Sequence, residues 1–301
     1  MIQSWQPPQA EFDNHWLRLT SQETGKLFED PAPKTWGGGG RILVGTSGYS
    51  FPDWQGGFYP QRLPRGEWLG YYARHFPVVE INATYYRLPP ASTFARMADA
   101  TPEGFGFWVK VPGEVTHRDG SIPGVIPEFR SSIGPLAEAG RLRGALAQLP
   151  HSFHRSEANM VGIQRLGEAM AGVPLAVEFR GAEWQTPETR EWLKSQQLIW
   201  VNTDLPDLPG LPKREAVVAA PTGYIRFHGR NDKTWYNPKA GDRYDYNYTC
   251  EELKWWVPHI QNFDAEGATI NIFFNNCHMG QAVKNAKMLM QLLELDSNPK
   301  P

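Results

Sequence analysis

Short apolar runs with the composition of buried β-strands recur eight times after Arg41, and helix-like segments separate them. The eight runs are Ile42 to Thr46, Val78 to Asn82, Phe105 to Val111, Gly144 to Leu149, Leu175 to Phe179, Leu198 to Thr203, Tyr224 to His228 and Thr269 to Phe274. Strands that alternate with helices form parallel sheets, and eight such units over about 250 residues match the length of a closed barrel. The sequence therefore predicts an α/β fold, a (β/α)8 TIM-type barrel.

Helix candidates fill most of the connections between these runs. They are Glu67 to His75, Ala91 to Ala98, Ser131 to Gly140, Glu157 to Ala171, Glu188 to Gln197, Glu251 to Asn262 and Gly280 to Leu293. Start signals support two of them, because Thr186 precedes Pro187 as an N-cap and Thr249 with Glu252 has capping-box spacing. The sixth connection carries four prolines from Asp204 to Pro221, so a loop without a regular helix is predicted there.

A doubly wound open sheet is the rival architecture. It is less favoured because the strand count reaches eight and no Gly-x-Gly-x-x-Gly run follows a strand and opens a helix. No nucleotide-cofactor motif is therefore identified.

Residues 1–40 differ from the rest of the chain, since a mixed polar stretch leads to the run Gly37 to Gly40. We expect an N-terminal extension with a Gly-rich tether at 1–40 and one barrel domain at 41–295.

Charge and cysteine content exclude several classes of protein. The 30 basic and 32 acidic residues give a net charge of −2, so no overall field attracts nucleic acid or anionic lipid. Cys250 and Cys277 are too few for a disulfide framework, and the first residues lack the pattern of a signal peptide. No apolar run approaches the ~18 residues of a membrane span. A cytoplasmic protein that does not enter the membrane is expected.

Polar residues gather where the predicted strands end. Arg226, His228 and Arg230 occupy alternate positions, so a strand through them points all three the same way. The same period proposes a set of inward-facing residues: Glu80, Asn82, Thr84, Lys110, Gln148, Glu178, Arg180, Asp204, Arg226, His228, Arg230 and Asn275. Because catalytic groups of such barrels lie at the carboxyl ends of the strands, we expect a slightly basic pocket for an anion there.

Chemical roles follow from residue type. Glu178, His228 and Lys110 are the candidate catalytic residues, with Glu178 or His228 as acid or base. The guanidinium groups of Arg226 and Arg230 suit a phosphate or carboxylate, as does the ammonium of Lys110. The further candidates for substrate binding are Glu80, Asn82, Thr84, Tyr49, His117, Arg180, Asn275 and Asn276.

The alternative interpretation is that Glu178 only pairs with Arg226 or Lys110 to balance buried charge. A metal is not favoured, because no His-Glu-x-x-His spacing is present and the basic neighbours repel cations.

Several segments resemble one known family. They are Val44-Gly45-Thr46-Ser47-Gly48-Tyr49-Ser50, Val79 to Tyr86, Phe107 to Pro112 with Thr116-His117, Glu178-Phe179-Arg180, Tyr224 to Arg230, and Phe273 to Asn276. In this order they closely resemble the YecE-like family, domain of unknown function 72. The resemblance implies a TIM-type barrel and supplies no activity. The N-terminal extension lies outside the usual pattern of the family.

Three functions stay open at this point. The first is an enzyme that applies general acid–base chemistry to a small anionic (phosphorylated or carboxylated) or sugar-like substrate. The second is a nucleic-acid-binding protein or endonuclease-like phosphodiesterase, which the net charge of −2 makes less favoured. The third is a non-catalytic ligand-binding or interaction protein that keeps the pocket.

Overall fold

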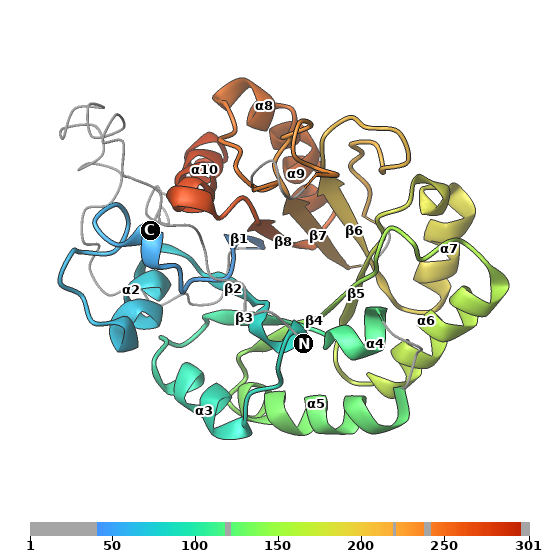
Figure 1. The fold of residues 1–301 in the computed structure, drawn as a ribbon, viewed down its shortest axis with the longest axis horizontal. Coiled ribbons are helices and arrows are strands. Elements are labelled where there is room, and N and C mark those ends of the chain that lie inside the picture. Colours follow the sequence, from blue (N-terminus) through green and yellow to red (C-terminus); the bar gives the residue numbers. More distant parts are fainter. Residues whose placement is uncertain (1–40, 118–121, 219–220, 238–241, 296–301) are drawn as a thin grey trace.

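The eight predicted strands form a closed barrel in a computed structural model that describes residues 41–117, 122–218, 221–237 and 242–295. The strands are β1 Ile42–Ser47, β2 Val78–Ile81, β3 Gly106–Lys110, β4 Leu142–Gln148, β5 Leu175–Glu178, β6 Ile199–Asp204, β7 Thr222–Phe227 and β8 Thr269–Phe274. They pair in sequence order, and Figure 1 shows them as a ring inside a ring of helices. The predicted TIM-type barrel is confirmed.

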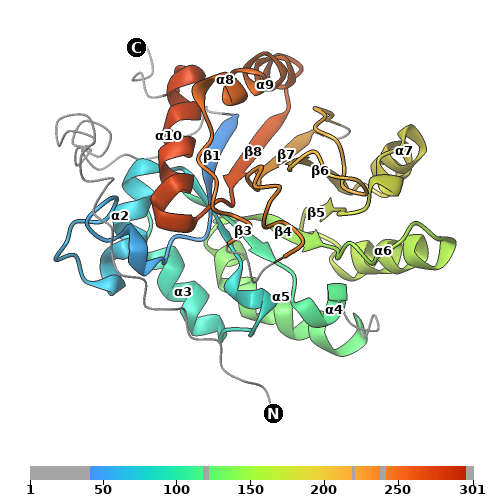
Figure 2. The same ribbon diagram turned by 45° about the horizontal axis from the view of Figure 1, so that its top comes forward.

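The ring closes between the first strand and the last. β1 pairs in parallel with β8 from Ile42 opposite Ile270 to Thr46 opposite Phe274. The backbone N–H of Ile270 also donates to the carbonyl oxygen of Arg41 at 2.6 Å. Helix α10, Gln281–Leu292, packs over this seam against both strands, as Figure 2 shows.

Large side chains fill the barrel interior below the mouth, by which we mean the carboxyl ends of the strands. The ring of Trp108 on β3 lies 4.7 Å from that of Tyr224 on β7, and its Nε1–H donates to Asn271 on β8 at 2.9 Å. Since β3 is adjacent to neither strand, these contacts cross the interior. The polar layer at the mouth therefore rests on a packed floor.

The helices are α2 Trp68–His75, α3 Ala91–Asp99, α4 Gly113–His117, α5 Ile122–Glu138, α6 Glu157–Ala169, α7 Pro187–Ser195, α8 Cys250–Lys254, α9 Trp256–Ala265 and α10. Both predicted caps are present: Thr186 caps α7, and Thr249 with Glu252 forms the capping box of α8. Three differences from the predicted helices are larger than one or two residues. Helix α4 was not expected, α5 begins nine residues before Ser131 and contains Pro127 and Pro135, and one expected helix is divided into α8 and α9.

The sixth connection has no helix in the part that the structure describes, residues 205–218 and Pro221, as its prolines predicted. The predicted extension at 1–40 lies outside the described residues. Among the described helices, none has both the length and the apolar composition to cross a bilayer.

Candidate functional site

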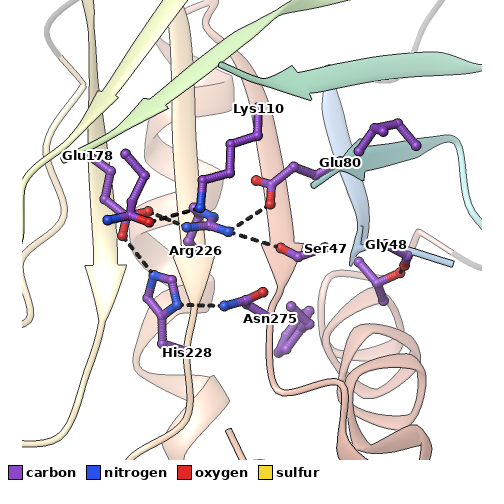
Figure 3. A network of polar contacts seen from close by, with 12 residues as sticks. Ser47, Gly48, Glu80, Lys110, Glu178, Arg226, His228 and Asn275 are labelled. Carbon is purple, nitrogen blue, oxygen red and sulfur yellow. Dashed lines mark hydrogen bonds and ion pairs between the residues drawn. The ribbon is translucent and has the colours of Figure 1, made fainter. Parts of the chain in front are cut away.

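A buried chain of charges spans the barrel mouth (Figure 3). The guanidinium of Arg226 on β7 donates to Glu178 Oε2 on β5 at 2.5 Å and to Glu80 Oε1 on β2 at 2.7 Å. The hydroxyl of Tyr224 donates to Glu80 Oε2 at 2.6 Å. All four side chains are buried. Because β2, β5 and β7 are not neighbours, these linked side chains connect distant strands of the barrel.

The carboxyl group of Glu178 is held as an anion. Burial alone would raise its pKa, but Arg180, Arg226 and His228 keep that pKa well below its ordinary value. One oxygen faces Arg226, and the other contacts Arg180 Nε and lies 3.2 Å from His228 Nε2. Glu178 thus pairs with Arg226, as the alternative interpretation of its charge expected, and it is a weak proton acceptor.

His228 is neutral and has both ring nitrogens engaged. Burial and the positive charge of Arg180 lower its pKa to about 3. The amide nitrogen of Asn275 lies 3.0 Å from His228 Nδ1. This arrangement suits the tautomer in which Nδ1 accepts a hydrogen bond from Asn275 and Nε2–H donates to Glu178. His228 therefore orients Glu178.

Lys110 at the end of β3 differs from Glu178 and Arg226, because its amine contacts neutral groups and not a charged partner. Nζ donates to Gln148 Oε1 at 2.9 Å and lies 4.3 Å from the ring centre of Tyr85. Among the described residues Lys110 has no ion pair, since the guanidinium groups of Arg226 and Arg180 occupy the nearby carboxylates. Burial, with repulsion from Arg226, lowers the pKa of Lys110 to about 8. Figure 3 shows its half-buried side chain reaching toward Arg226.

Arg230 lies in a separate polar cluster. β7 ends at Phe227, and the chain turns at Gly229, whose φ of +86° favours glycine. Arg230 then binds both oxygens of Asp204, at 2.6 and 2.7 Å, and Glu252 at 3.2 Å. Alternation along the strand thus brings Arg226 and His228 together at Glu178 and does not bring Arg230 there.

Three more of the predicted residues come from the segments that follow β2 and β3. Thr84 donates to the carbonyl oxygen of Lys110 at 2.5 Å. Asn82 is half-buried, and its Oδ1 has no hydrogen-bond partner among the described residues. His117, exposed at the end of α4, has its ring 5.1 Å from that of Tyr85. All three neighbour the β2 and β3 side of the mouth.

Two predicted residues are turned to other tasks. The amide nitrogen of Asn276 donates to Asn285 Oδ1 at 2.7 Å, which ties it to α10. The ring of Tyr49 is partly buried against the hydrophobic core, and its centre lies 6.3 Å from that of Tyr72. Tyr224 was not predicted as a site residue, although its position two residues before Arg226 placed it on the same strand face. In the described part of the chain no three or more His, Cys, Asp or Glu side chains are placed to hold a metal ion.

Comparisons with known proteins agree with this fold. The family described as protein of unknown function DUF72 matches residues 43–301. The chain is 29% identical to the UPF0759 protein YunF of Bacillus subtilis over 272 residues, covering 85% of this chain and 95% of that protein. It is 32% identical over 114 residues to the UPF0759 protein YecE of Escherichia coli, covering 37% of this chain and 39% of that protein.

Solved structures give the same assignment. A DUF72 family protein from Thermotoga maritima superimposes with a TM-score of 0.77 at 38% identity, covering 84% of this chain and 99% of that one. A DUF72 family protein from Enterococcus faecalis gives a TM-score of 0.75 at 28% identity, covering 86% of this chain and 99% of that one. The chain belongs to the DUF72 family, and it is similar to the UPF0759 proteins YunF and YecE.

Proposed function

We propose that this protein is an enzyme that applies general acid–base chemistry to a small anionic or sugar-like substrate at the barrel mouth. Lys110 is the group that exchanges the proton. The observation that carries the proposal is its half-buried amine, which has a pKa lowered to about 8 and no carboxylate partner among the described residues. A group that titrates near the working pH is the most effective acid or base.

The charge of the site supports an anionic substrate. The carboxylates of Glu80 and Glu178 are balanced by the guanidinium groups of Arg226 and Arg180. The ammonium form of Lys110 therefore leaves an excess of one positive charge among these five side chains. A phosphate or carboxylate group of a substrate would neutralise that charge, and Arg180, on the wall beside it, adds a planar donor.

The other two candidate catalytic residues support the site by position. Glu178 holds Arg226, Arg180 and His228 in place as a permanent anion. His228 fixes the orientation of that carboxylate through Nε2–H. In this assignment neither residue exchanges a proton with the substrate, and both shape the field around Lys110.

The test begins with a screen of small phosphorylated and carboxylated compounds for ligands that raise the melting temperature. Turnover of each such compound is then followed between pH 6 and 10 in the natural protein, Lys110→Met and Lys194→Met. Lys194 is exposed on α7 and serves as the matched control. We expect Lys110→Met to lower kcat by about 10²- to 10⁴-fold. Full turnover by a folded Lys110→Met variant excludes the proposed role.

A further inference from the structure

Lys110 differs from other lysines of the protein in what surrounds its amine. Lys254 and Lys213 are exposed and each contacts a carboxylate, Glu251 at 2.6 Å and Asp207 respectively. The amine of Lys110 instead meets the amide oxygen of Gln148 and the face of Tyr85. An ammonium ion carries three donors, and the described residues offer Lys110 one hydrogen-bond acceptor. The surroundings therefore suit a neutral amine, which carries a free electron pair.

The charges facing Lys110 come from four sides of the mouth. Arg226 on β7 and Arg180 after β5 oppose its protonation, and the exposed His117 of α4 lies within their electrostatic reach. Glu178 on β5 and Glu80 on β2 favour protonation, but both are already paired with arginine. Burial is the largest influence, and the pKa falls to about 8. A substantial fraction of the amine is then unprotonated near neutral pH.

We propose that Nζ of Lys110 is a nucleophile that condenses with the carbonyl group of an anionic aldehyde or keto acid. The inference rests on the proposed function and narrows its substrate to carbonyl compounds that carry a carboxylate or phosphate group. The substrate's anionic group lies against the planar guanidinium of Arg180, and the positive charge of the protonated imine, once formed, attracts that group further. Its carbonyl carbon faces the lysine amine.

The condensation needs no oxidant or reductant. The electron pair of the neutral amine forms the C–N bond while the carbonyl oxygen takes up a proton from solvent. The attacking nitrogen then loses one proton, the hydroxyl group takes up a proton and leaves as water, and a protonated imine remains. The overall uptake is one proton for each imine formed and each water released. The imine withdraws electrons from the neighbouring carbon, which is the purpose of such a step in lysine enzymes.

The test is reductive trapping with glyoxylate, a small anionic aldehyde, and sodium cyanoborohydride. The intact natural protein is treated for short times between pH 6 and 9, and peptides are analysed by mass spectrometry for carboxymethyl-lysine. We expect Lys110 to be modified on the order of 10-fold faster than Lys254 or Lys213 at pH 7.5, because more of its amine is neutral. The rate at Lys110 should rise to a plateau above about pH 8. Propionaldehyde, which is neutral, should show a smaller preference for Lys110.

Equal rates of modification at Lys110 and Lys254 would overturn the nucleophilic role. A Lys110→Arg variant keeps the positive charge and should lose the fast-reacting site while Lys254 reacts as before. Failure to trap Lys110 would refute the nucleophilic role alone. The general acid–base role of Lys110 is tested separately, by the turnover of Lys110→Met. If Lys110→Met retains turnover and Lys110 is not trapped, both the proposed function and this inference are wrong.

Discussion

At the scale of single residues, Arg226 is the side chain on which the polar layer depends. It is buried and binds two buried carboxylates, so its removal leaves Glu80 and Glu178 without their shared counter-charge. We expect Arg226→Met to lower the free energy of unfolding by about 3–5 kcal/mol. Urea denaturation measures this loss. Arg87→Met changes an exposed arginine and should cost less than about 0.5 kcal/mol. Equal costs for the two variants would show that the buried ion pairs do not stabilise the fold.

His228 makes stability depend on pH. Its pKa is near 6.5 in the unfolded chain and about 3 in the fold, where burial and Arg180 oppose protonation. The folded state therefore binds fewer protons, and the contribution is present above pH 6.5 and lost as the pH falls toward 3. Between pH 7 and 5 the natural protein should lose about 2 kcal/mol more than His228→Gln does. His151→Gln, at an exposed position, should follow the natural protein. Matching pH profiles for all three proteins would contradict the neutral, buried imidazole.

At the scale of elements, β1 and β2 approach too closely to admit a side chain at Gly45. A Cβ atom there would lie 2.0 Å from the carbonyl oxygen of Val78, its partner in the register. Since backbone cannot yield as a side chain does, Gly45→Ala should destabilise the protein by about 1–3 kcal/mol or more. Gly162 in α6 has no atom within 4 Å of the same position. Gly162→Ala should stabilise the protein by up to ~1 kcal/mol through helix propensity. Thermal melts of both variants measure the contrast, and similar shifts would refute it.

The strands could be predicted from the sequence more fully than the helices. A strand buried on both faces is a short, nearly continuous apolar run, and such runs marked the bounds of all eight strands to within two residues. Helix α5 was only partly found, because Pro127 and Pro135 interrupt the pattern that identifies a helix. Packing of α5 against α3 and β4 outweighs the hydrogen bonds that these prolines remove.

The candidate site could be predicted where the strand period holds and not beyond it. Arg226 and His228 face Glu178 because β7 and its continuation keep alternation through these positions. Arg230 follows the turn at Gly229, so its direction depends on Asp204, which is 26 residues away in sequence. Which carboxylate forms an ion pair with which basic side chain likewise depends on distances in the folded protein. For that reason nothing in the sequence indicated that the amine of Lys110 would meet an amide oxygen and, among the residues that the structure describes, no carboxylate.

At the scale of the whole molecule, the pairing of β1 with β8 closes the barrel, and the described contacts of this seam begin at Arg41. Its carbonyl oxygen accepts from Ile270, and its Nε contacts Asp264 at 2.9 Å. We therefore expect a chain of residues 41–301 to unfold cooperatively, within about 4 °C of the full chain. A chain that begins at Gly48 lacks β1 and exposes the edges of β2 and β8, so it should lose the cooperative transition and aggregate. Calorimetry and light scattering distinguish these outcomes. Loss of cooperative unfolding in the 41–301 chain would show that the barrel needs residues 1–40, contrary to the predicted boundary.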